Sequence, residues 1–320
     1  MSIGDYLALP FAQHALIAST LVAVTCGLVG PFVTCRNMAF AVHASAELAF
    51  TGAAAGLLVA GNAVGGALAG AIVVAALIAV LTTRRRERDS AIGVVLAAGL
   101  ALGVLLLGYY HGFATEATNI LFGDIFGVST GQIVLLAVIA AAATAILTVI
   151  HRPLLFASVD PEVAAARGLA TGLLGLTFLV LLAFTVTEAA QVVGTLLVLS
   201  LAITPAASAQ RLAAGPLAMA GLSVAFAVLA ADGGLILSLQ SGTVKPSVLV
   251  ASISFALYLG ARLAGPGLRR RHRARRVGVA GVADPACPVG PACSVGPAGP
   301  VGPVRPAGSG RPGGSATMDT

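Results

Sequence analysis

Residues 63–82 read AVGGALAGAIVVAALIAVLT and contain no charged side chain. A helix needs about 20 mostly apolar residues to cross the hydrocarbon core of a bilayer, so this stretch alone predicts a membrane span. Eight other stretches share its character, and the nine candidates cover residues 14–33, 41–60, 63–82, 91–109, 131–150, 169–187, 189–210, 214–231 and 247–264. The sequence therefore predicts an all-α polytopic membrane protein with about nine transmembrane helices.

The composition of the whole chain agrees with this prediction. Of its 320 residues, 58% are hydrophobic and only 9% are charged, there is no Trp, and the mean hydropathy is +0.99. A soluble domain carries about 25% charged residues, and a disordered chain has low hydrophobicity. The composition therefore excludes both a water-soluble globular protein and a fully disordered one.

The positive charges predict the orientation of the helices. If the chain alternates through nine spans, fifteen of its 18 Lys and Arg residues fall on one side, and the one lysine, Lys245, falls on the other. Because basic residues gather on the cytoplasmic side, the N-terminus is expected outside and the C-terminus in the cytoplasm. The sequence pI of 9.7 then reflects topology and contact with lipid headgroups rather than nucleic-acid binding.

The C-terminal part of the chain differs from the rest. We expect a transmembrane domain at residues 1–268, followed by a cytoplasmic tail at 269–320 that begins with RRRHRARR and continues rich in Gly and Pro. Residues 277–320 contain ten Gly and eight Pro, which predicts disorder. The tail also holds Cys287 and Cys293. With four cysteines in the whole chain, no disulfide framework is implied.

Charged side chains within the predicted spans are candidates for function, because they are costly in a membrane. His43 and Glu47 lie four residues apart in the second span and so share one helix face. An imidazole and a carboxylate can both ligate a divalent metal such as Zn²⁺ or Mn²⁺. A hydrogen-bonded pair that fixes helix packing is the alternative, because two ligands do not complete a site. Glu188 and Asp232 are expected at membrane boundaries, where water solvates them.

Two loops are longer than the others. The outer loop, about 110–130, contains an apolar stretch around Asp124, which is a weaker metal candidate. The inner loop, 151–168, predicts a short helix at 161–167: Asp160 suits the N-cap, Pro161 the first turn, and Gly168 a left-handed stop. This helix either closes a turn or docks a cytoplasmic partner.

Several motifs of self-contained enzymes are missing from the sequence. It has no GxxxxGK[ST] phosphate-binding loop, and it also lacks HExxH, GxSxG and CxxCH. We therefore expect a chain that is not an enzyme and that cannot hydrolyse ATP through such a loop.

Five collinear segments resemble the membrane permease subunits of zinc and manganese ABC importers. They are RNMAFAVHASAELAFTGAAAGLL (36–58), RERDSAIGVVLAAGLALGVLLL (86–107), ILFGDIFGVS (120–129), DPEVAAARGL (160–169) and VVGTLLVLSLAITPAASA (192–209). Many members of that family carry an Asp and a His four apart in the second span. Here His43 and Glu47 exchange the order of imidazole and carboxylate, but both ligand types remain.

The resemblance implies partners as well as a function. It implies a homodimeric pore, two cytoplasmic ATPase subunits and an extracytoplasmic metal-binding protein, with Zn or Mn as cargo and no permanently bound cofactor. The short helix and its flanks would be the element that couples to the ATPase, through Asp160, Pro161, Glu162, Ala165, Arg167 and Gly168. Two alternatives stay open: an ABC permease for iron or iron chelates, and a stand-alone secondary cation carrier.

Overall fold

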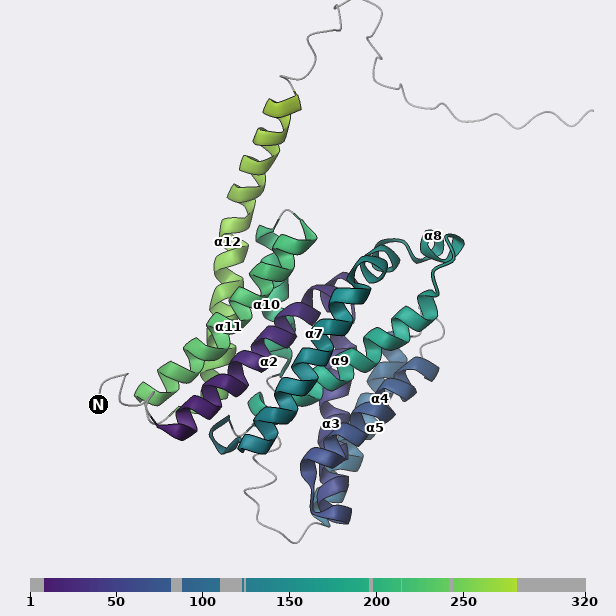
Figure 1. Ribbon diagram of the computed structural model, residues 1–320, viewed down its shortest axis with the longest axis vertical. Helices are drawn as coiled ribbons and strands as arrows, with labels where there is room; N and C mark the ends of the chain where they lie inside the picture. Colours follow the sequence, from purple (N-terminus) through teal and green to yellow (C-terminus); the bar gives the residue numbers. More distant parts are fainter. Residues whose placement is uncertain are drawn as a thin grey trace, which may run out of the picture. The chain divides into compact units, whose positions relative to one another are not determined.

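The described part of the computed structural model is entirely helical (Figure 1). It comprises residues 9–81, 88–109, 123, 125–195, 198–213, 215–241 and 244–280. In chain order the helices are α2 (Pro10–Cys35), α3 (Ala39–Ala60), α4 (Ala63–Leu81), α5 (Arg88–Gly108), the 3₁₀ turn η1 (Ile125–Gly127), α7 (Thr130–Val159), α8 (Pro161–Ala166), α9 (Thr171–Val193), α10 (Val198–Leu212), α11 (Pro216–Ser241) and α12 (Pro246–Ala280).

Most of the predicted membrane spans are present as long helices. Within the described residues, α2, α3, α4, α7, α9, α11 and α12 are long and apolar enough to cross a bilayer. The other two predicted spans are shorter, since the apolar part of α5 covers Ile92–Gly108 and α10 has 15 residues. The all-α membrane fold is confirmed, although these two helices fall below the length of a full span.

The predicted seventh span, 189–210, is interrupted near its start. Helix α9 continues through residue 188 to Val193, and Gly194 then adopts a φ of +97°, outside the range of an α-helix. Helix α10 begins only at Val198 and continues through Pro205. The interruption is therefore at the glycine, whose missing Cβ permits the positive φ.

Helix α7 is longer than predicted. It begins with a capping box, in which Ser129 and Gln132 satisfy each other's backbone N–H groups, and it continues past Pro153 to Val159. Its 30 residues span about 45 Å at 1.5 Å per residue, more than the hydrocarbon core requires. The expectation of a loop over 151–168 is therefore wrong for residues 151–159, which are helical.

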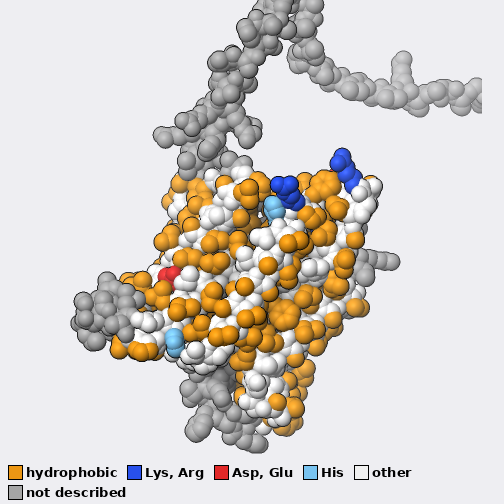
Figure 2. Space-filling view, in the orientation of Figure 1, with side chains coloured by type: hydrophobic (Ala, Val, Ile, Leu, Met, Phe, Trp, Pro, Cys, Tyr) orange, Lys and Arg blue, Asp and Glu red, His pale blue; other side chains and the backbone are white. Residues whose placement is uncertain are grey.

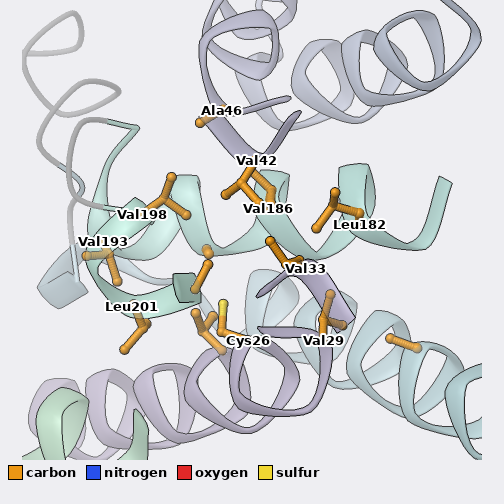
Figure 3. Close-up of a cluster of buried hydrophobic side chains, with 14 of the residues drawn as sticks. Cys26, Val29, Val33, Val42, Ala46, Leu182, Val186, Val193, Val198 and Leu201 are labelled. Carbon is orange, nitrogen blue, oxygen red and sulfur yellow. The ribbon is translucent and has the colours of Figure 1, made fainter. Parts of the chain in front are cut away.

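Helix α2 lies at the centre of the packing and contacts α7, α9, α10 and α11. Figure 3 shows part of the resulting core, in which side chains of α2, α3, α9 and α10 meet. The labelled residues include Cys26 and Val33 of α2, Val42 of α3 and Val186 of α9, and each is at most 1% exposed. One side of α3 is thereby packed against the core.

Helix α3 also packs closely on α4, through glycines on both helices. Gly52 and Gly56 form a GxxxG motif on α3, and Gly66 and Gly70 form another on α4. A Cβ added to Gly66 would lie 2.3 Å from the backbone oxygen of Gly52, so no larger residue fits without movement. Small residues of this kind let membrane helices approach each other closely. Helix α3 is therefore held firmly between α4 and the core.

The exterior has the character of a lipid-facing surface. In Figure 2, hydrophobic side chains cover most of the visible face, and the Lys and Arg side chains that it shows lie at one end. Exposed residues such as Val59, Val80 and Val149 are more than 70% accessible. In water such a surface would cause aggregation, whereas in a bilayer it contacts the lipid chains.

The chain divides into two units, Met1–His272 and Arg273–Thr320. Helix α12 includes residues 277–280, so the predicted disorder does not begin at residue 277. Residues 281–320, with Cys287 and Cys293, lie outside the described residues, as does Asp124.

Candidate functional site

His43 and Glu47 lie one turn apart in the first half of α3. The Glu47 side chain is 2% exposed, and that of His43 is half-buried. Neither Nδ1 of His43 nor Oε2 of Glu47, both buried, has a hydrogen-bond partner. Leaving a buried polar atom unpaired costs about 1–3 kcal/mol, so native proteins rarely keep one without a reason. The pair therefore does not resemble a satisfied packing contact.

The backbone around Glu47 is held in place by neighbouring helices. Thr51, one turn further along α3, bonds through Oγ1 to the backbone oxygen of Gly99 on α5 at 2.6 Å, and it lies 3.1 Å from the backbone oxygen of Glu47. The Cβ atoms of Gly52 and Gly56, if present, would collide with α4. Helix α3 thus presents Glu47 from a fixed position.

Glu188 is a second buried carboxylate, which the sequence placed at a solvated membrane boundary. That expectation is wrong, because α9 continues five residues beyond Glu188 and leaves its side chain 2% exposed. Its Oε1 atom has no hydrogen-bond partner, and the same holds for the buried hydroxyls of Thr185 and Thr187 nearby on α9. The sequence did contain a signal for this burial. The mostly apolar residues AAQVV follow Glu188, and they extend the membrane helix beyond it.

Helices α3 and α9 pack against each other, so both buried carboxylates belong to one group of neighbouring helices. Among the described residues, however, no three His, Cys, Asp or Glu side chains come together as a metal site. Within this chain the candidate site therefore offers His43 and Glu47 as a nitrogen and oxygen donor pair, with Glu188 as a separate buried acceptor.

Asp232 contrasts with these two glutamates. It lies well inside α11 rather than at the outer end of the helix, so its predicted boundary position is also wrong. It is half-buried, and the hydroxyls of Ser19 and Thr20 on α2 donate hydrogen bonds to its carboxylate. Because these hydroxyls compensate its burial, Asp232 has a structural explanation as a link between α2 and α11.

The short helix α8 has the ends that the sequence predicted. Oδ1 of Asp160 accepts hydrogen bonds from the backbone N–H groups of Glu162 and Val163, at 3.2 and 3.1 Å. At the other end Gly168 has a φ of +82°, and the N–H groups of Gly168 and Leu169 donate to the backbone oxygens of Ala165 and Ala164. This is a Schellman motif with its stop at Gly168 as predicted, although the helix itself ends at Ala166, one residue before the predicted end, with Arg167 as the C-cap.

Helix α8 lies in the connection between α7 and α9 (Figure 1), and most of its side chains are exposed. Ala164 is fully buried and anchors the helix, whereas Glu162, Val163, Ala165 and Arg167 are exposed. The guanidinium of Arg167 lies 6.0 Å from the centre of the Phe156 ring on α7. A rigid, capped element with a free outer face is well suited to contact another protein.

Comparisons with known proteins identify the family. The ABC 3 transport family matches residues 8–264. The manganese transport system membrane protein MntC of Halalkalibacterium halodurans is 31% identical over 254 residues, which cover 78% of this chain and 87% of the relative. The high-affinity zinc uptake system membrane protein ZnuB of Haemophilus influenzae is 27% identical, with 74% and 92% covered.

A solved structure supports the same assignment. The complex of PsaBC from Streptococcus pneumoniae with a Fab contains a chain that superposes on this one with a TM-score of 0.75 and 28% identity, covering 83% of this chain and 96% of that chain. The chain therefore belongs to the ABC 3 transport family, as a membrane permease subunit.

Proposed function

We propose that this permease moves Mn²⁺ or Zn²⁺ into the cytoplasm by alternating access, as the membrane subunit of an ABC importer. His43 and Glu47 bind the cation on its way through the membrane. The proposal rests on one observation above all: two buried, unpartnered polar atoms of the kinds that ligate divalent metals lie one turn apart on a helix with no other charged side chain.

The chemistry of the pair accounts for the choice of cargo. Nδ1 of His43 and a carboxylate oxygen of Glu47 form a mixed nitrogen and oxygen set, which suits Zn²⁺ and is acceptable to Mn²⁺. Relatives at similar identity are named for manganese and for zinc, so the comparisons favour this class of ion without choosing within it. A bare ion also needs a narrower path than an iron chelate.

Two donors from one chain do not complete a coordination sphere. A second copy of the chain in a homodimeric pore would supply another His43 and Glu47. Glu188 offers a further carboxylate on the adjacent helix α9. Weak, successive sites let an ion enter and leave without being trapped.

The energy comes from a cytoplasmic ATPase that docks on α8. The side chains of Glu162, Val163, Ala165 and Arg167 form the exposed face of this helix, and the Asp160 cap and the Gly168 stop keep it rigid. Movement of the ATPase would be transmitted through α7 and α9, which the helix connects. On the outer side a metal-binding protein delivers the ion.

The test is uptake of radioactive manganese and zinc by cells that lack the chain and carry either the wild type or a variant. His43→Ala and Glu47→Gln should each lower uptake at least about tenfold, because each removes a donor to the ion. His14→Ala, which changes a histidine of α2, is the matched control and should transport normally. Membrane abundance is measured for every variant.

Related transport measurements distinguish the alternatives. Loss of ferric-chelate uptake with normal manganese and zinc uptake would show an iron permease. Metal movement by the purified chain alone in liposomes, driven by an ion gradient, would show a secondary carrier. Wild-type uptake by the His43→Ala/Glu47→Gln double variant would show that the pair has only a structural role.

A further inference from the structure

A second group of metal-ligating side chains lies away from the proposed pathway residues. A pocket with a volume of about 390 Å³ opens between α2, α7 and α11, and its wall is mainly apolar. Leu28 and Phe32 of α2 and Leu147 and Leu155 of α7 form much of this wall. The pocket falls within the volume range of small-ligand sites, which combine apolar walls with a few polar groups.

Three side chains that can bind metal line this pocket, and each comes from a different helix. They are Cys35 at the end of α2, His151 on α7 and Met219 near the start of α11. Cys35 is exposed, whereas His151 and Met219 are half-buried. The only other described cysteine, Cys26, is 1% exposed in the core.

The three donors have a common chemical preference. Thiolate and thioether sulfur are soft ligands that select Cu⁺ and Zn²⁺, and imidazole suits the same ions. Mn²⁺ prefers carboxylate, carbonyl and water oxygen, and no Asp or Glu lines the pocket. The pocket therefore differs in chemistry from the His43 and Glu47 pair, which contains a carboxylate and no sulfur.

The position of the pocket favours a reduced, metal-binding cysteine. Arg36 caps α2, Arg152 follows His151 on α7, and Arg211 lies in the last turn of α10, just before α11; the charge distribution assigns all three to the cytoplasmic side. Thiols remain reduced in the cytoplasm, where a disulfide would not form. Cys35 is thus available as a ligand in the compartment into which the importer releases its cargo.

We propose that Cys35, His151 and Met219 form a second metal site, for a thiophilic ion such as Cu⁺ or Zn²⁺. Because the ligands come from α2, α7 and α11, a bound ion cross-links the cytoplasmic end of α2 to those of α7 and α11, which both pack against α2. Occupancy of the site therefore restrains these helices relative to one another, in response to a soft metal on the cytoplasmic side.

The experiment measures the rate at which a small uncharged maleimide alkylates Cys35 in the purified full-length chain. Cys287→Ser and Cys293→Ser are introduced first, so that the tail cysteines neither react nor bind metal. Zn²⁺, Cu⁺ and Mn²⁺ are added separately. We expect Zn²⁺ or Cu⁺ to slow alkylation, Mn²⁺ to have no effect, and His151→Ala to weaken the protecting ion's apparent affinity at least about tenfold.

Further variants separate this site from the proposed pathway. Met219→Leu preserves the apolar volume and should weaken protection, whereas the His43→Ala/Glu47→Gln variant should retain it in full. His151→Gln is the second test if His151→Ala does not fold, and X-ray absorption of the bound ion should show both sulfur and nitrogen neighbours. Equal protection in the wild type, His151→Ala and Met219→Leu would overturn the proposal, because it would reveal a lone thiol. Protection by Mn²⁺, or by none of the ions, would overturn it as well.

Discussion

At the scale of single residues, the buried acids of this permease fall into two kinds. Asp232 accepts hydrogen bonds from Ser19 and Thr20, so its polar atoms are compensated. Glu47 and Glu188 are each 2% exposed and each keep one carboxylate oxygen without a partner. An uncompensated carboxylate destabilises the fold, and under the proposed function it would be retained to bind an ion that passes through.

This distinction predicts opposite effects of the same substitution. Glu188→Leu should raise the free energy of unfolding by about 1–3 kcal/mol, because it removes an unpartnered buried group. Asp232→Leu should lower it by a similar amount, because the hydroxyls of Ser19 and Thr20 lose their acceptor. Thermal unfolding of the two purified variants in detergent measures the difference. If Glu188→Leu were destabilised as strongly as Asp232→Leu, Glu188 would be a structural residue.

The sequence anticipated part of the candidate site. The four-residue spacing predicted that His43 and Glu47 share one side of a helix, and the structure places both on α3. The lack of partners for Nδ1 of His43 and Oε2 of Glu47 could not be predicted, because it depends on which residues the neighbouring helices bring near them. The burial of Glu188 was missed for a related reason: its environment depends on where α9 ends, and hydropathy alone locates helix ends poorly.

At the scale of helices, the packing of α3 on α4 fixes the position of the candidate ligands. Gly52 on α3 faces Gly66 and Gly70 on α4, and the two backbones are too close for any side chain between them. The paired GxxxG motifs were visible in the sequence, but not which helices they would join. Pairing requires knowledge of the tertiary arrangement.

Enlarging one of these glycines should separate the two helices. Gly66→Leu places a side chain where even a Cβ lies 2.3 Å from the backbone oxygen of Gly52, and overpacking of this kind costs about 1–3 kcal/mol. Gly93→Leu on α5 is the matched control, since a Cβ there has no neighbour within 4 Å. We expect a lower unfolding temperature and reduced metal uptake for Gly66→Leu alone. Equal stability of both variants would contradict the close contact.

Helix α8 supplies a second prediction at this scale. Proline in a helix interior costs about 3 kcal/mol, so Ala165→Pro should disrupt this six-residue helix, whereas Ala165→Ser should preserve it. We expect Ala165→Pro to reduce metal uptake because ATP hydrolysis is no longer coupled to transport. Uptake and ATP hydrolysis are measured together in the reconstituted importer. Unchanged coupling and unchanged co-purification with the ATPase would show that the ATPase does not dock here.

The ends of α8 were predictable and the end of α7 was not. Asp160 and Gly168 act through local backbone geometry, which a short stretch of sequence contains. Helix α7, in contrast, continues through Pro153, a residue that normally ends a helix. The continuation depends on contacts with other helices, such as the complete burial of Leu154, which no local pattern reveals.

At the scale of the whole molecule, the arrangement of the few charged residues is consistent with the predicted orientation of the helices. Three arginines from the predicted cytoplasmic side lie over aromatic rings: Arg36 is 5.3 Å from the ring centre of Phe178, Arg167 is 6.0 Å from that of Phe156, and Arg211 is 5.1 Å from that of Tyr258. Arg211 also donates a hydrogen bond of 3.0 Å to the Tyr258 hydroxyl. Of these, Tyr258 with Arg211 is the kind of pair that anchors a helix at a membrane surface, whereas Phe178 is buried in the core.

The arginines at the helix ends and the buried acids have different explanations. The arginines at the helix ends are explained by orientation in the membrane, and Asp232 by its contact with α2. His43 and Glu47 have neither explanation, and they lie on a helix that its neighbours hold tightly. The central claim is therefore that these two residues bind the transported ion, while the surrounding helices change access to it from one side to the other.

Uptake of radioactive manganese or zinc into proteoliposomes, driven by ATP through the complete importer, tests this claim most directly. The account predicts that the His43→Ala/Glu47→Gln variant assembles with its ATPase and metal-binding protein but loses at least about tenfold in uptake, because the ion has lost two of its ligands. Uptake at the wild-type rate by this double variant, in a fully assembled complex, would contradict it.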